Sequence, residues 1–367
     1  MRASFPIHLF YYSIFLRLLQ DTREKFTILP KALIFAKKYA IMMCILFVKG
    51  ILIFMKFLNN IKGSLILAVA SLIWGLAFVA QAQAADLVPP FAFNSIRCFI
   101  GAAALFAVLG LKRLKTKKTI FPTEKAKIKE MLIGGILCGI MLTVSVNFQQ
   151  YGLSVYPDGS ASEARAGFIT ALYVVLVPIV SMFFGKKSGI AIWFSVAVAV
   201  CGIYLLSLSE GLHNVYLGDI LMLGCALTFT FHILVIDRYG EPVGGMLLSA
   251  LQFLIGGVLS GLLALCFETV GWQNVLAAAP QLLYMGIMSS GVAYTLQIYG
   301  QRYAEPPVAS LTMSLESVFA ALGGWIISGN TLTPREFGGC ALVFAAIVLA
   351  QLPQFFGKKK DAKTVAE

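Results

Sequence analysis

An apolar pattern that occurs twice is the feature that most constrains the fold of this chain. Residues 144–205 read VSVNFQQYG, a loop, FITALYVVLVPIV and a closing apolar run, and residues 291–352 read GVAYTLQIYG, a loop, ASLTMSLESVFAAL and another apolar run. Two copies of one membrane-embedded module can enclose a site near the bilayer midplane and expose it alternately to either side. The repeat therefore favours a transporter.

The composition points to an integral membrane protein. Hydrophobic residues make up 59% of the chain, charged residues 13%, and the mean hydropathy is +0.85, values that do not give a soluble surface. The formal net charge is +12, but the cations lie in short segments between apolar runs, where they set topology. We therefore expect no nucleic-acid partner, because no soluble basic domain is present to bind one. The 7 cysteines lack the close spacing of metal or redox sites, so we interpret them as packing residues.

Stretches of about 20 apolar residues, the length that crosses a bilayer core as a helix, recur along the chain. The predicted spans are 64–84, 90–111, 131–152, 163–184, 189–208, 217–236, 246–267, 279–300, 305–328 and 337–356. The predicted fold class is therefore an all-α integral membrane protein with ten transmembrane helices, five in each repeat.

Lysine and arginine gather on one side of the predicted membrane. They crowd the loop 112–130, follow span four at 186–187 and recur in the tail at 358–360 and 363, whereas the loops 85–89, 209–216 and 268–278 contain none. The positive-inside rule then assigns both ends of the ten-span unit to the cytoplasm. Because five spans are an odd number, the second repeat enters from the other side, which makes the halves an inverted repeat. We interpret the basic loop as a topology signal; the alternative is binding of anionic lipid.

The predicted domains are a first repeat at 61–208, a second repeat at 217–356 and a basic cytoplasmic tail at 357–367. The segment 1–54 does not fit this plan. Its apolar run 39–55 is short for a span and interrupted by Lys49, and an eleventh span would place the preceding lysines outside. We therefore expect translation to start at Met55, with 1–54 either a mis-assigned start or a peripheral extension.

Six motifs follow one another along residues 61–355. They are SLIWGLAFVAQ, FNSIRCFIGA, NFQQYGL, AGFITALYVVLVPIV, GCALTFTFHILVIDRYG and SLTMSLESVFAALGGWIISG. Their order resembles the EamA family of the drug/metabolite transporter (DMT) superfamily, ten-helix carriers built from two EamA repeats. The resemblance implies a multi-pass carrier of the cytoplasmic or inner membrane that moves amino acids, metabolites, sugars or toxic compounds. Family members often have a proline directly after the glutamate of span nine, whereas Ser317 follows Glu316 here. The proline that would predict a kink in this helix is therefore missing.

Charged residues inside the predicted spans are the first site candidates, because they are costly there unless they face a cavity or a partner. Glu316 lies near the middle of span nine with Thr312 one turn before it on the same face, and the resemblance marks this glutamate as a family feature. It is either a proton-binding or substrate-binding carboxylate, or a structural one. Arg97 lies about 10 Å into span two. As a gating charge it attracts an anionic substrate group or pairs with a carboxylate; the alternative is that it snorkels to the outer headgroups.

Polar stripes end spans three and eight at matching places. The first comprises Thr143, Asn147, Gln150 and Tyr151, and the second comprises Tyr294 and Gln297. They either line a shared central cavity or hydrogen-bond between helices. Further candidates for the cavity walls are Trp74, Phe168, Thr170, Tyr173 and His232. Each of these is also compatible with a packing role.

The predicted function is a secondary transporter, an exporter of small metabolites such as amino acids, that works by alternating access. The alternative is a passive channel or a non-transporting membrane receptor. The sequence has no GxxxxGK[ST] element and no HExxH spacing, so we expect neither ATP coupling nor an enzyme, and no cofactor or metal. The expected partners are a small-molecule substrate and the lipid bilayer, with a monomer or homodimer as the assembly.

Overall fold

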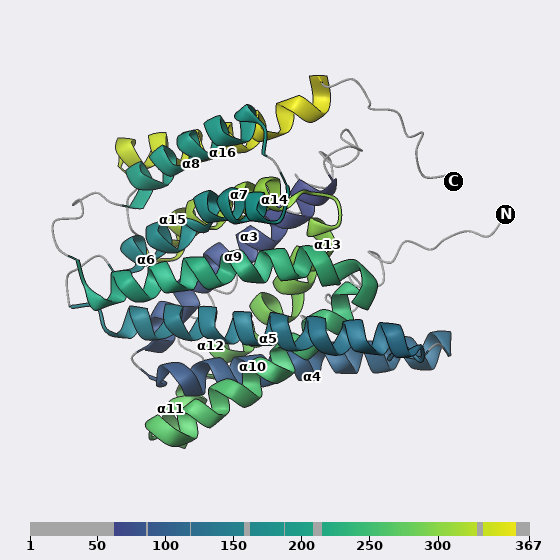
Figure 1. Cartoon of the computed structure of the whole chain (residues 1–367). Helices are drawn as coiled ribbons and strands as arrows, with labels where there is room; N and C mark the ends of the chain where they lie inside the picture. Colours follow the sequence, from purple (N-terminus) through teal and green to yellow (C-terminus); the bar gives the residue numbers. More distant parts are fainter. Residues whose placement is uncertain are drawn as a thin grey trace, which may run out of the picture. The chain divides into compact units, whose positions relative to one another are not determined.

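The structure, a computed structural model, describes residues 62–85, 87–117, 119–157, 162–186, 188–207, 215–328 and 333–356 (Figure 1). These residues form helices joined by short connections, and none of them lies in a strand. The predicted extension 1–54 and the predicted tail 357–367 lie outside the described residues.

The helices fall into two runs along the chain. The first run is α3 (Lys62–Ala85), α4 (Pro90–Thr116), α5 (Lys125–Ser154), α6 (Ser162–Ala171), α7 (Tyr173–Phe183) and α8 (Ile190–Ser207). The second run is α9 (Leu217–Val243), α10 (Gly245–Phe267), α11 (Trp272–Ala277), α12 (Ala279–Leu283), the π-helix η1 (Tyr284–Ala293), α13 (Tyr294–Gln301), α14 (Pro306–Met313), α15 (Leu315–Ser328) and α16 (Pro334–Phe356).

Helix boundaries follow from local chemistry. Proline stands in the first turn of α4, α12 and α14, where its missing N–H is not needed. The carboxylate of Glu268 accepts hydrogen bonds of 2.8 Å from the backbone N–H groups of Phe91 and Ala92, which caps α4 from a distant part of the chain. Gly244 separates α9 from α10 with a φ of 90°, a conformation that glycine adopts at little cost.

Six of the described helical segments are long and apolar enough to cross a membrane. They are Lys62–Gln81, Pro90–Thr116, Lys125–Ser154, Ala166–Phe183, Leu217–Val243 and Gly245–Phe267. Ile190–Leu205 is a shorter apolar helix, and the segments predicted as spans eight and nine are interrupted. The molecule is therefore an all-α membrane protein, and the complete set of ten spans stays a prediction.

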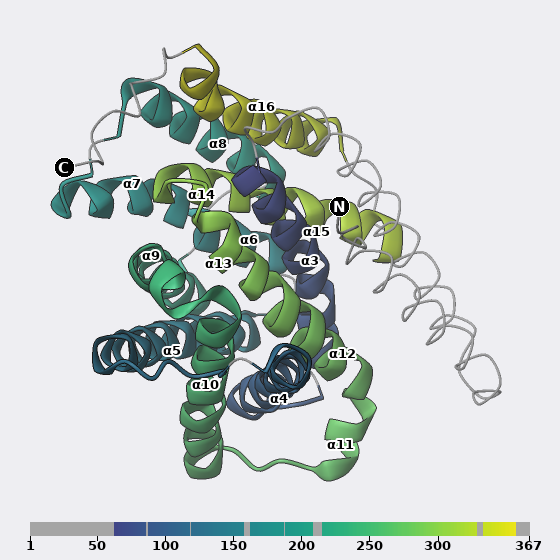
Figure 2. The same cartoon turned by 90° about the vertical axis from the view of Figure 1, so that its right-hand side faces the viewer.

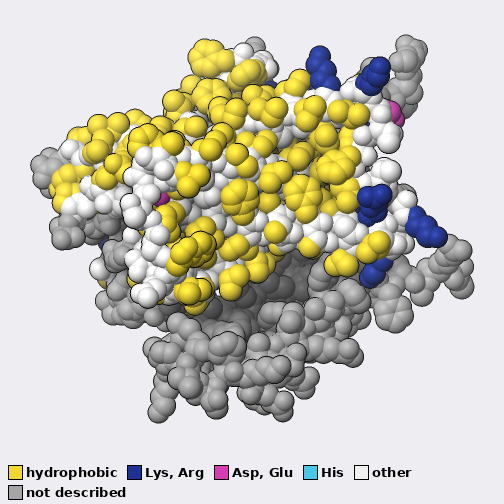
Figure 3. Space-filling view, turned by 90° about the horizontal axis from the view of Figure 1, so that it is seen from below, with side chains coloured by type: hydrophobic (Ala, Val, Ile, Leu, Met, Phe, Trp, Pro, Cys, Tyr) yellow, Lys and Arg dark blue, Asp and Glu magenta, His cyan; other side chains and the backbone are white. Residues whose placement is uncertain are grey.

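The surface agrees with a lipid environment. On α10 the exposed side chains include Leu254, Val258, Leu262 and Leu265, whose spacing places them on one helix face. Figure 3 shows a broad hydrophobic area on one face of the molecule, with lysine and arginine toward one side. We call the end of the bundle where α4 ends and α5 begins the basic end, because the basic loop 112–130 connects these helices there.

Helices from the two runs pack against each other (Figure 2). The pairs with the most extensive contact are α5 with α9 and α10, α8 with α16, α4 with α10 and η1, and α3 with α15, η1 and α13. Glycines permit the closest approaches: a Cβ added to Gly75 of α3 would lie 2.5 Å from Cβ of Phe319 on α15. The core is thus made between the two halves of the chain.

Two helices break at matching places. A turn at Leu172 separates α6 from α7, and a turn at Ser314 separates α14 from α15. Each break comes two residues after a threonine, Thr170 or Thr312. The second break forms without a proline after Glu316, so the missing family proline does not prevent an interruption of this helix.

Candidate functional site

A pocket lies between the two halves of the chain and holds about 540 Å³ of space free of protein atoms, its open mouth included. Residues of α3, α4, α5, α6, α7, α9, η1, α13, α14 and α15 line it. Seven of the predicted site residues are among them: Trp74, Arg97, Thr170, Tyr173, Tyr294, Gln297 and Glu316. The folded chain therefore brings together residues that are more than 200 positions apart in sequence.

The carboxylate of the pocket lies beside the two helix breaks. Tyr173 is the first residue of α7, and Glu316 is in the first turn of α15. The Tyr173 hydroxyl donates a hydrogen bond of 3.0 Å to Oε1 of Glu316. A carboxylate in the first turn of a helix is also stabilised by the positive end of the helix dipole. The breaks thus provide two stabilising interactions for a charge inside the bundle.

Arg97 supplies a positive charge to the same pocket. Its side chain is 3% exposed and lines the pocket, which contradicts the alternative that it snorkels to the outer headgroups. Its Nε has no hydrogen-bond partner, and among the described side chains no ion pair joins it to Glu316. The pocket therefore offers a guanidinium group and a carboxyl group that are not paired with each other.

Aromatic rings and amides complete the walls. The Trp74 and Tyr294 rings meet edge to face with centroids 4.8 Å apart, and Nε1 of Trp74 has no hydrogen-bond partner. Three glutamines, Gln81, Gln149 and Gln297, also line the pocket. The arrangement suits a small polar molecule whose body packs on aromatic rings.

Two predicted candidates serve packing between helices instead. Asn147 donates hydrogen bonds to Ser260 Oγ (2.8 Å) and to the Thr143 carbonyl (2.9 Å), and accepts one from Asn94 (2.9 Å). His232 is fully buried and shares a 2.9 Å hydrogen bond between its Nε2 and Oε1 of Gln252. Neither lines the pocket, which corrects their placement there.

Four more candidates lie away from the pocket lining. Gln150 is buried outside it, and Tyr151 is 41% exposed and stacks on Phe91. Phe168 packs its ring against Tyr204. Thr312 uses its hydroxyl to bond the carbonyl of Val308, as is common for threonine in helices. The predicted polar stripe of α5 is therefore rotated away from the pocket.

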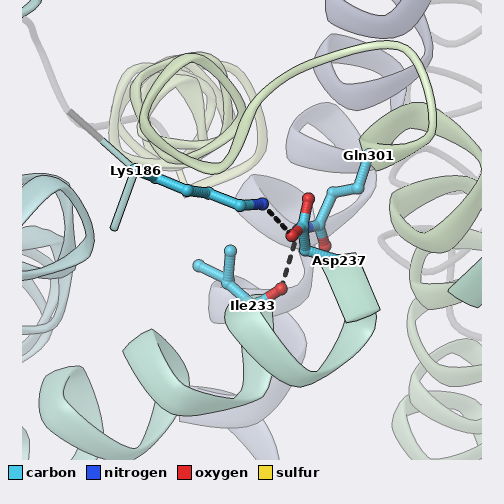
Figure 4. Close-up of polar contacts among 4 residues, drawn as sticks. All are labelled: Lys186, Ile233, Asp237 and Gln301. Carbon is cyan, nitrogen blue, oxygen red and sulfur yellow. Dashed lines mark hydrogen bonds and ion pairs between the residues drawn. The ribbon is translucent and has the colours of Figure 1, made fainter. Parts of the chain in front are cut away.

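Polar interactions join α9 to its neighbours on the basic-end side of the pocket (Figure 4). Ile233 of α9 lines the pocket, and its carbonyl accepts a 3.0 Å hydrogen bond from Nε2 of Gln301. One turn further along α9, Asp237 forms an ion pair with Lys186. These contacts tie α9 to the chain after α7 and to α13. We call them the basic-end closure.

The sequence analysis missed three polar residues of the pocket: Gln81, Gln149 and Ser289. Gln81 lies at the end of the SLIWGLAFVAQ motif, so its intramembrane amide was a visible signal. Gln149 is adjacent to the predicted Gln150, so the prediction missed the pocket-facing residue of α5 by one position. Ser289 lies in η1, and π-helical turns are frequent at functional sites.

The sequence matches the family model of the EamA-like transporter family twice, over residues 61–208 and 216–352. An uncharacterized transporter of Archaeoglobus fulgidus is 32% identical over 298 residues, which are 80% of this chain and 87% of that protein. The inner membrane transporter YedA of Escherichia coli (strain K12) is 25% identical over 297 residues, 77% of this chain and 89% of YedA. The threonine/homoserine exporter RhtA of the same strain is 29% identical over 193 residues, 50% of this chain and 60% of RhtA.

The fold has a counterpart among solved structures. One protein of known crystal structure superposes with a TM-score of 0.65 at 19% sequence identity, covering 79% of this chain and 96% of that one. At this identity the likeness concerns the fold alone. The two family matches together cover most of the chain, and the membrane-spanning helices agree with them. The chain belongs to the EamA-like transporter family.

Proposed function

We propose that the protein is a secondary transporter that exports small amino acids or similar zwitterionic metabolites across the cytoplasmic membrane. It works by alternating access between two inverted five-helix halves, with both ends of the ten-span unit in the cytoplasm. The observation that carries the substrate class is the pair of Arg97 and Glu316, opposite charges that line one pocket without an ion pair between them.

Helix packing supports the inverted repeat. In an inverted repeat, each predicted span corresponds to the span five places away along the chain. Under this correspondence α5 matches η1 and α13, and α9 matches α3. The contact of α5 with α9 therefore corresponds to the contact of η1 and α13 with α3, and both contacts exist. In the same way the contact of α3 with α15 becomes that of α9 with α6 and α7, and both exist. The contacts of α4 with α10 and of α8 with α16 map onto themselves. Such exchange is expected of a pseudo-two-fold axis in the membrane plane.

The helix breaks support a site at the centre of such a transporter. Secondary carriers often bind substrates at discontinuous helices near the midplane, where helix ends are free to interact with charged groups. Here the breaks at Leu172 and Ser314 occupy matching places in the two halves, and the Tyr173–Glu316 hydrogen bond joins them.

The charges of the pocket support a zwitterionic substrate. The carboxylate of an amino acid suits the guanidinium of Arg97, and its ammonium suits Glu316. The export of threonine and homoserine by RhtA, which is 29% identical over half of this chain, adds support for this substrate class. Glu316 is also the first candidate for a protonation step that couples transport to a proton gradient.

The basic-end closure supports alternating access. Gln81, Arg97 and Gln149 lie toward the ends of α3, α4 and α5 that are remote from the basic loop. The opposite end of the pocket is tied by Lys186–Asp237 and by Gln301. With the basic end in the cytoplasm, this arrangement corresponds to a state closed to the cytoplasm.

Counterflow in proteoliposomes tests the proposal. The full chain is reconstituted with a labelled panel of amino acids, sugars and amines, beside a Glu316→Gln variant. We expect saturable exchange of amino acids that the variant loses. Exchange of sugars or amines alone would reject the substrate class, and non-saturable flux would indicate a channel. Ligand binding without flux would indicate a receptor.

A further inference from the structure

The side-chain amides of the described residues differ in their partners. Away from the pocket, Asn147, Gln252 and Gln301 form hydrogen bonds with other helices, whereas Oε1 of the buried Gln150 has no partner. In the pocket, Gln81, Gln149 and Gln297 form none with the residues that the structure describes. Gln81 and Gln297 are only 5% and 2% exposed, and Oε1 of each lacks a partner. Buried amides without partners destabilise a protein, and because these two also line the pocket, a ligand bound there can supply the missing hydrogen bonds.

Gln297 lies further toward the basic end than Glu316. Gly75, next to Trp74, approaches the backbone of Glu316, and Trp74 meets the ring of Tyr294, so these groups share one level. Gln297 follows Tyr294 by three residues on α13, about 4.5 Å further along the axis toward the basic end. A substrate that is held by Arg97 and Glu316 and extends toward the basic end would therefore direct its side chain toward Gln297.

The residues of α9 and α14 that line the pocket furthest toward the basic end are apolar. They are Ile233 and Met313, and the carbonyl of Ile233 is already bonded to Gln301. Gln297 thus provides a polar group at an otherwise apolar end. A side chain that reached this point without a hydrogen-bonding group would leave the buried amide unsatisfied.

From this geometry we infer that Gln297 is a specificity-determining residue, whose amide hydrogen-bonds a hydroxyl or amide group in the side chain of the transported amino acid. The inference rests on the proposed function, since Arg97 and Glu316 hold the α-carboxylate and α-ammonium. A site built for a hydrogen bond rejects an apolar isostere strongly, whereas an apolar pocket discriminates weakly. The protein therefore prefers polar amino acids over apolar ones of the same shape.

Competition between isosteres tests the inference. In proteoliposomes of the full chain, the exchange of whichever labelled amino acid counterflows is inhibited with threonine against valine, and with asparagine against leucine. Each pair has nearly the same shape and differs in hydrogen-bonding groups. We expect the polar member to compete at about tenfold lower concentration, the effect of one hydrogen bond to a buried group.

Two substitutions assign the preference to Gln297. The quantity compared is the ratio of the inhibitory concentration of the apolar amino acid to that of its polar isostere. Gln297→Leu keeps the size of the side chain and is expected to reduce this ratio to about two or less. Gln150→Leu is the matched control, because Gln150 is equally buried but does not line the pocket, and it leaves the ratio unchanged. A ratio that persists in folded Gln297→Leu protein would overturn the inference.

The ratio of inhibitory concentrations in the wild-type protein tests the inference even where a variant fails to fold. Equal competition by threonine and valine, and by asparagine and leucine, would overturn the specificity of Gln297 and leave an amino-acid transporter standing. Absence of exchange with every amino acid, by protein that is folded by circular dichroism, would overturn both the inference and the proposed function.

Discussion

Tyr173 donates a hydrogen bond of 3.0 Å to Oε1 of Glu316, and the two residues begin the second helices of two broken spans. The bond therefore links the halves of the chain at the points where both helices are interrupted. A movement of one half against the other changes the surroundings of this carboxylate. The pair is positioned to couple the charge in the pocket to the conformation of the bundle.

We predict that Tyr173→Phe lowers the rate of counterflow about tenfold without unfolding the protein. The substitution removes a donor to a carboxylate, and hydrogen bonds to charged groups contribute about 1.5–3 kcal/mol. The matched control is Tyr151→Phe, because Tyr151 lies outside the pocket lining. Equal counterflow rates in the two variants would show that the Tyr173 hydroxyl has no part in transport.

We predict that Gly75→Ala destabilises the protein and reduces transport. The added Cβ would lie 2.5 Å from Cβ of Phe319 and 2.8 Å from the carbonyl oxygen of Glu316. Because these atoms belong to or adjoin the backbone of α15, the helix has to move, and overpacking of this kind costs about 1–3 kcal/mol. The measurement is the midpoint of thermal unfolding in detergent, together with counterflow.

Gly110→Ala is the control for Gly75→Ala. Gly110 is also in a helix interior, on α4, but no atom lies within 4 Å of an added Cβ. The variant is expected to be as stable as the wild type or slightly more stable, since alanine has the higher helix propensity. A Gly75→Ala protein with an unchanged midpoint would argue against close packing of α3 on α15.

The sequence analysis was most successful where the signal was local. Charges and aromatic groups inside apolar spans, such as Glu316, Arg97 and Trp74, identified residues that meet in the pocket. Sequence patterns did not predict the role of a residue whose hydrogen-bond partners lie on distant parts of the chain. Ser260 and Asn94 bind Asn147, and their positions in sequence do not reveal this contact.

The sequence pattern also did not predict which face of a helix turns toward the pocket or where a helix is interrupted. Gln149 and Gln150 are adjacent, so one turns to the pocket and the other does not, and a stripe of polar residues leaves this rotation open. The break at Ser314 has no proline to announce it. The π-helical segment Tyr284–Ala293 contains no proline that would predict a departure from α-helical geometry.

We predict that substitutions of two polar residues of α5 affect different properties, stability in one case and substrate binding in the other. Asn147→Leu leaves Ser260 without its partner and leaves Asn94 bonded only to the Val146 carbonyl, so the free energy of unfolding falls by about 1–3 kcal/mol, while the substrate concentration at half-maximal exchange is unchanged. Gln149→Leu, in the pocket lining, raises that concentration with little effect on stability. The same effect of both substitutions on both quantities would contradict the assignment of these residues to separate roles.

The Lys186–Asp237 ion pair is predicted to favour the state that is closed at the basic end. The side chains of this pair are 50% and 23% exposed, so the pair contributes at most about 1 kcal/mol, and its loss shifts the population of open molecules about two- to fivefold. In a protein without native cysteines, Ser289→Cys provides a probe in the pocket. A membrane-impermeant thiol reagent, added on the side of the basic end, should label it faster in Lys186→Ala and in Asp237→Ala.

Controls for this last prediction use charge and salt. Lys127→Ala removes a similar ion pair, with Glu124, that is remote from the pocket lining, and labelling should not change. The exchanged pair Lys186→Asp with Asp237→Lys should restore slow labelling. High salt should speed labelling of the protein that keeps the pair and leave Lys186→Ala unaffected, because salt screens exposed charges. Equal labelling in all variants would mean that hydrogen bonds such as Gln301 to Ile233 hold this end closed without the ion pair.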